Sequence, residues 1–137
     1  DFIALEKAHL NKGWKLVDNW HPDNKAGKRN SFVDVPMLEA TRPGDRLTLD
    51  FRGKAIGIFC VSGPSAGILE YSVDGAPFKE LDTFTEWSHN LYIPWVYMLE
   101  TELKDTDHKL VLRISKKKNP ASQGTECQIR NFVVNGR

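Results

Sequence analysis

The sequence has little of several features that mark out particular protein classes. Cysteine occurs only twice in 137 residues, at Cys60 and Cys127, which is too few for a disulfide scaffold and lacks the spacing of a zinc site. The longest apolar run, Ala55 to Val61, is too short to span a bilayer. The formal net charge is only +1, so the protein has no strong positive electrostatic potential to attract nucleic acid. We therefore expect neither a nucleic-acid partner nor a membrane span.

Helical patterns are also scarce, and strand patterns dominate. Only residues 2–10 favour a short helix. Alternating apolar and polar residues predict half-buried strands at 46–51 and 108–115. The pair Asp74-Gly75 has the composition of a tight hairpin turn. Further strands are expected at residues 55–61, 68–73, 78–81 and 127–135.

These strands are separated by Pro, Gly and Asp turn signals, with no alternation of strands and helices. Many short strands punctuated in this way are typical of a sandwich. We therefore predict one all-β domain over residues 1–137, an antiparallel β-sandwich of jelly-roll type similar to carbohydrate-binding modules. Residues 19–31 are polar and aperiodic, which predicts a long loop.

Two serines raise the question of hydrolysis. Ser65 lies in Gly63–Gly67, which matches the G-x-S-x-G nucleophile elbow, but a strand pattern follows where the elbow requires a helix. Ser88 neighbours His89, yet adjacent residues on an extended segment point to opposite faces. An independent hydrolase is therefore the last of our three hypotheses, and we assign no catalytic residue.

The sequence also gives no firm metal site or cofactor. None of the histidines pairs with another at the i, i+4 spacing of a helical zinc site, and His108 is expected in a turn. Asp18, Asn19 and Asp23 offer oxygen ligands for calcium, but their spacing fits no known calcium loop. We expect no cofactor, with structural calcium as an unsupported alternative.

Several longer blocks resemble a β-sandwich domain attached, usually C-terminally, to bacterial SGNH-type (GDSL-type) esterases. They include GWKLVDNWHP, FVDVPML, GKAIGIFCVSGPSAGILEYSVDG, LYIPWVYMLETEL and CQIRNFVVN, in that order. The resemblance extends from Gly13 to Asn135. It implies an accessory domain of a longer secreted or periplasmic SGNH hydrolase chain, whose Ser, Gly, Asn and His catalytic blocks this sequence does not contain. It also implies acylated polysaccharide as the substrate class of the parent enzyme.

Two further hypotheses concern the role of such a domain. The first is a module that binds or presents glycan through exposed aromatic and polar side chains. Its candidate carbohydrate-binding residues are Trp87, His89, Tyr92, Trp20 and His21. The second is a structural module that packs on the hydrolase domain. Alternation places Trp95 and Tyr97 on one face with Leu91, Ile93 and Leu99, which predicts that both rings lie in the core.

Overall fold

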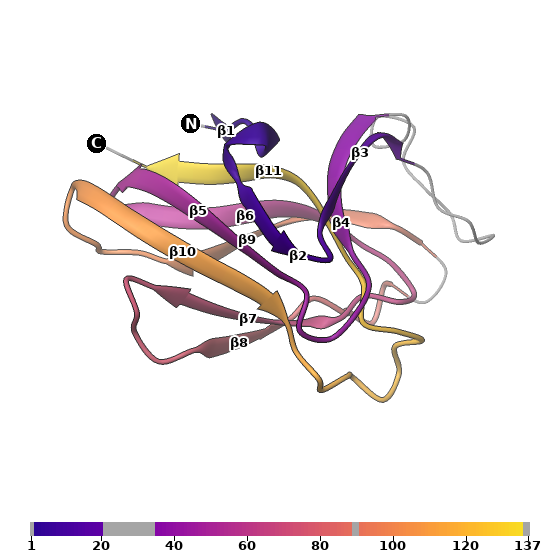
Figure 1. Cartoon of the computed structure of the whole chain (residues 1–137). Coiled ribbons are helices and arrows are strands. Elements are labelled where there is room, and N and C mark those ends of the chain that lie inside the picture. Colours follow the sequence, from indigo (N-terminus) through magenta and orange to yellow (C-terminus); the bar gives the residue numbers. More distant parts are fainter. Residues whose placement is uncertain (1, 21–34, 89–90, 136–137) are drawn as a thin grey trace.

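The computed structural model shows two antiparallel β-sheets packed face to face (Figure 1). It describes residues 2–20, 35–88 and 91–135. The strands are β1 (Phe2–Ile3), β2 (His9–Lys12), β3 (Lys15–Trp20), β4 (Val35–Ala40), β5 (Arg46–Gly53), β6 (Ala55–Ser62), β7 (Ile68–Val73), β8 (Lys79–Asp82), β9 (Ile93–Glu100), β10 (Thr106–Ile114) and β11 (Cys127–Asn135).

The strand order confirms the predicted jelly-roll sandwich. Sheet A has the order β3-β4-β11-β6-β9, and β1 also pairs with β11, whereas sheet B has the order β2-β5-β10-β7-β8. From β4 to β7 the chain changes sheet at every strand, and it does so again from β8 to β11. Since β9 and β8 each end a sheet, the two strands form one open edge of the sandwich. An ion pair of 2.7 Å between Lys79 Nζ on β8 and Glu100 Oε2 on β9 links them.

Most predicted strands are present, but the predicted helix is not. The strand at Cys127–Asn135 has the predicted bounds, and Asp74 and Gly75 form the hairpin turn with φ values of 55° and 77°. Residues 2–10 instead form β1, a short 3-10 turn at Leu5–Lys7 and the start of β2. Both strands find partners, β11 and β5, and this pairing overrides the weak local helical preference.

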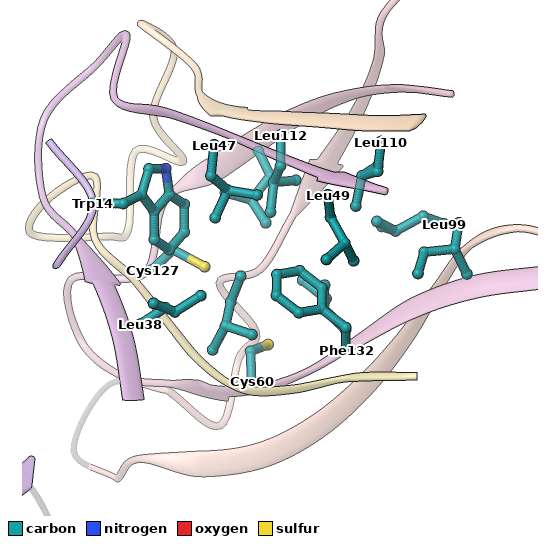
Figure 2. Close-up of a cluster of buried hydrophobic side chains, with 14 of the residues drawn as sticks. Trp14, Leu38, Leu47, Leu49, Cys60, Leu99, Leu110, Leu112, Cys127 and Phe132 are labelled. Carbon is teal, nitrogen blue, oxygen red and sulfur yellow. The ribbon is translucent and has the colours of Figure 1, made fainter. Parts of the chain in front are cut away.

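The core lies between the sheets, as the labelled side chains of Figure 2 show. Leu47, Leu49, Leu110, Leu112 and Phe132 are all fully buried there. Strand alternation directs these residues inward from both sheets, as the sequence predicts.

Cys60 and Cys127 belong to the same core and are free thiols, as expected from their apolar strand faces. Burial raises the pKa of the Cys60 thiol to about 12, and it raises that of Cys127 well above its ordinary value. Both groups therefore remain protonated and unreactive in the folded protein.

Strand β9 corrects one prediction about the core. Leu99 is buried and Tyr97 packs against the core, but the Trp95 side chain is 43% exposed. The alternation is right, because Trp95 pairs with Cys60 and shares its inward face. Its burial is nevertheless incomplete, because β9 is the last strand of sheet A and β8 is the last of sheet B.

Within the described residues, no helix is long and apolar enough to cross a bilayer.

Candidate functional site

Trp87 projects from a short turn that follows β8. Its side chain is 64% exposed, as the sequence predicts. The turn runs from Thr85 to Ser88 and is closed by a backbone hydrogen bond of 3.0 Å from Ser88 N to Thr85 O. The Thr85 amide also donates to Ser88 Oγ at 3.2 Å, and the two hydroxyls lie 3.0 Å apart. These bonds fix the backbone that presents the indole ring.

Trp95 places a second exposed indole on the same open edge. Its ring lies beside that of Tyr97, with centroids 6.4 Å apart. The Tyr97 hydroxyl donates across the edge to the carbonyl of Thr83, at 3.5 Å, where the segment bearing Trp87 begins. We call Trp87 and Trp95 together the tryptophan edge. The sequence alone did not identify Trp95, because alternation shows which face a residue occupies but not where the opposite sheet ends.

Two other candidate residues are buried, so the expectation that they are exposed is wrong. Trp20 is 3% exposed and Tyr92 is 4% exposed, and their rings pack edge to face with centroids 5.3 Å apart. Trp20 ends β3 rather than opening a loop, and its Nε1 donates to Glu39 Oε2 at 3.0 Å. Met37 and Val61 complete this second apolar cluster. Neither ring offers a free face to a sugar.

The two remaining candidates, His21 and His89, lie outside the described residues. Residues 21–31 of the predicted loop also lie outside the described residues, as does Asp23, one of the three possible calcium ligands. Asp18 and Asn19 are exposed residues of β3. In the part of the chain that the structure describes, no three His, Cys, Asp or Glu side chains are grouped as metal ligands would be.

Ser65 and Ser88, the two possible nucleophiles, both occupy turns in which their roles are structural. Ser65 lies in a tight turn, in which Ala66 N donates to Gly63 O, and the chain then enters β7 instead of a helix. The helix that a nucleophile elbow needs is thus replaced by a strand, as predicted. Ser88 is fully buried, and its hydroxyl is bonded within the Trp87 turn.

The sequence predicts that His108 opens the strand at 108–115 as a turn residue, but β10 begins two residues earlier and His108 lies inside it. It is 8% exposed and contacts two acceptors. Nδ1 lies 2.5 Å from Asp74 Oδ2, and Nε2 lies 2.7 Å from the carbonyl of Lys104. A neutral imidazole can donate to only one of them, so this geometry favours the doubly protonated ring. The bond to Asp74, then the Lys104 carbonyl, raises the pKa of His108.

Comparisons with known proteins place the fold among carbohydrate-active enzymes. A two-domain esterase active on acetylated mannans, crystallised with mannopentaose, has a TM-score of 0.61 at 15% identity. A family two carbohydrate esterase from Cellvibrio japonicus has a TM-score of 0.55 at 11% identity. A Paenibacillus xanthan lyase has a TM-score of 0.63 at 15% identity. At these identities the likeness shows the fold alone.

The chain corresponds to only part of each of these enzymes. It is covered over 96%, 95% and 100% of its own length, but it spans only 38%, 32% and 13% of theirs. No protein-family model matches the sequence, and no curated protein matches it. The fold of this chain is therefore a β-sandwich similar to one part of these larger carbohydrate-active proteins.

Proposed function

We propose that this chain is a non-catalytic accessory domain of a secreted or periplasmic SGNH-type carbohydrate esterase, and that it binds or presents acylated polysaccharide. Three observations support the proposal. The sequence blocks resemble domains attached to such esterases. The fold is similar to part of a two-domain esterase active on acetylated mannans. The tryptophan edge offers two exposed indole rings on a rigid frame.

The observation that most directly supports glycan binding is the hydrogen-bonded turn that exposes Trp87. Sugar rings have apolar faces that stack on aromatic side chains, and a platform that is already ordered loses little conformational entropy on binding. The Trp87 ring is 64% exposed, although its turn is closed by bonds between Thr85 and Ser88. A single exposed ring is common on protein surfaces, but two exposed indoles on one edge offer a larger apolar surface, so we assign this pair to ligand binding.

The test is retention of the purified domain on acetylated mannan in affinity electrophoresis. We expect Trp87→Ala and Trp95→Ala each to weaken retention at least tenfold, since losing an aromatic anchor costs roughly 2 kcal/mol or more. Phe2→Ala is the matched control, because Phe2 is 66% exposed but lies on β1, away from the tryptophan edge. Unchanged retention in both tryptophan variants, each shown to be folded at the assay temperature, would refute the proposed site.

A structural role is the second candidate, and one surface favours it. The outer face of sheet A, turned away from sheet B, carries an apolar row in which Phe2 pairs with Val133, Val133 with Gly57, and Gly57 with Met98. Phe2 is 66% and Met98 45% exposed. Such a row is suited to packing on the hydrolase domain of the same protein.

The variants Phe2→Ala and Trp87→Ala distinguish the structural role from glycan binding. If the domain only packs on the hydrolase domain, Phe2→Ala should weaken its association with a separately expressed hydrolase domain. In that case Trp87→Ala should leave both this association and glycan retention unchanged. If the domain binds glycan through the tryptophan edge, only the tryptophan variants should change retention.

A further inference from the structure

A row of like charges crosses the outer face of sheet B. Lys12 on β2 is the register partner of Arg46 on β5, and Arg46 is the partner of Arg113 on β10. Arg46 and Arg113 point away from the core, because their sequence neighbours Leu47 and Leu112 point into it. Lys12 shares this outer face as the register partner of Arg46. Like charges directly opposite each other destabilise a sheet, so the fold itself does not explain this row.

Only one end of the row is neutralised. Arg113 Nε donates to Glu70 Oε1 at 2.8 Å, and its guanidinium carbon lies 3.6 Å from the centroid of the Phe78 ring. Other cations surround the unneutralised end. In the described parts of the chain, no ion pair involves any of five cations: Lys12, Lys15, Arg42, Arg46 and Lys116.

These cations line two hollows, each of which includes residues of the turn at 41–46. One hollow is lined by Arg46 and Lys116, among others, and the other by Lys12, Lys15 and Arg42. The nearby carboxylate of Asp45 is buried, and its Oδ2 accepts the amides of Thr41 and Arg42 at 3.3 and 3.1 Å. Asp45 therefore holds the turn together. Glu70 also lines the first hollow, but it is paired with Arg113, so Arg46 and Lys116 leave that hollow with unpaired positive charge.

We propose that this cationic row binds a carboxylate-bearing, anionic polysaccharide, at a second site separate from the tryptophan edge. Neighbouring strands lie about 4.8 Å apart, so Lys12 and Arg46, which form no ion pair in the described residues, can contact successive charged groups of an extended chain. The planar guanidinium of Arg46 can bond a sugar carboxylate through two parallel N–H donors. Lys15, Arg42 and Lys116 add to the positive electrostatic potential around the row without bonding the ligand in a fixed geometry.

The surroundings favour a glycan over a single-stranded nucleic acid. Proteins that bind single strands combine a basic groove with aromatic rings on which the bases stack. The aromatic ring placed beside this row is Phe78, and one of its faces is occupied by Arg113. The row therefore offers charge and hydrogen bonds but little stacking surface, which matches a carboxylated sugar chain.

The experiment measures binding of the whole domain to polygalacturonate, with neutral mannan as the comparison. Arg46→Gln removes the central charge, and Arg52→Gln is the matched control on the same strand and outer face, where Arg52 pairs with Asp107 at 3.3 Å. We expect Arg46→Gln to weaken polygalacturonate binding roughly tenfold, as the loss of a charge-assisted bond should. Arg52→Gln should change it less than about twofold, because distant exposed charges are largely screened in physiological salt.

Each other outcome overturns the proposal. Equal losses in the two variants would show a non-specific charge effect. Absence of polygalacturonate binding by the unmodified domain would show no such site, and tighter binding to single-stranded DNA would assign the row to another polyanion. Trp87→Ala distinguishes this site from the proposed function, because it should lower retention on mannan and leave binding to polygalacturonate intact. Loss of both ligands in Trp87→Ala would mean that the row is not a separate site.

Discussion

Replacing each of three tryptophans with alanine should separate core from surface by the size of the stability loss. Trp20→Ala removes a ring that is 3% exposed and packed on Tyr92, Met37 and Val61. Truncating a buried aromatic residue costs about 3–5 kcal/mol, through lost transfer free energy and the cavity left behind. For a domain of this size each kcal/mol lowers the melting temperature by roughly 3 °C. We therefore expect Trp20→Ala to melt roughly 10–15 °C lower.

The exposed rings should behave differently. Trp87 is 64% exposed, and truncation at such a position usually changes stability by less than about 0.5 kcal/mol. Trp95 is 43% exposed and pairs with the core residue Cys60, so Trp95→Ala should lie between the other two, at about 2 kcal/mol. The expected order of melting temperatures is therefore Trp87→Ala, then Trp95→Ala, then Trp20→Ala as the lowest.

The assay is thermal unfolding followed by circular dichroism, repeated in urea to obtain free energies. Trp20→Phe is the control, because it keeps an aromatic ring while losing the bond from Nε1 to Glu39. Glu39 Oε2 still accepts from Gln128 Nε2 at 2.9 Å, so this variant should lose about 1 kcal/mol for the missing bond, in addition to the smaller ring. A Trp87→Ala domain less stable than Trp20→Ala would refute the burial pattern and the tryptophan edge.

Three further predictions concern titration, thiols and hydrolysis. The pKa of His108 is raised above its ordinary value of 6.5 by Asp74, so the stability lost in His108→Gln should be largest below pH 6.5 and fall as pH rises through the folded pKa, in urea unfolding at several pH values. A similar loss at every pH would contradict the protonated ring. Thiol titration without reductant should find Cys60 and Cys127 unreactive in the native protein and both reactive in denaturant; no reactive thiol in denaturant would indicate a disulfide. The domain alone should not release nitrophenol from activated esters, and turnover that disappears in Ser65→Ala would overturn this expectation.

Several features could be predicted from the sequence because they depend on local patterns. Alternation located β5 and β10, since one face of each strand must be apolar to pack on the opposite sheet. Asp74-Gly75 predicted its turn, because this pair tolerates the positive φ values that the hairpin requires. Trp87 was predicted to be exposed from its polar neighbours, and it is.

The remaining features depended on which elements meet in space. Trp20 and Tyr92 are far apart in sequence, yet both are buried because they pack on each other beside Met37. Residues 2–10 became strands because distant strands offered them hydrogen-bond partners. The pairing of His108 with Asp74 likewise joins β10 to the hairpin turn that follows β7, 34 residues earlier in the chain.

The sequence by itself determined the fold class, most of the strands, the hairpin and the face that each strand residue occupies, because these follow from a repeat of two residues along the chain. Only the tertiary structure decided the order of the strands, and this order determines burial. Trp95 is exposed because β9 is an edge strand. Arg46 faces Lys12 and Arg113 because β5 lies between β2 and β10. The exposure of Trp95 and the cationic row are thus products of strand order, which is selected by the packing of the whole chain and has no local signature.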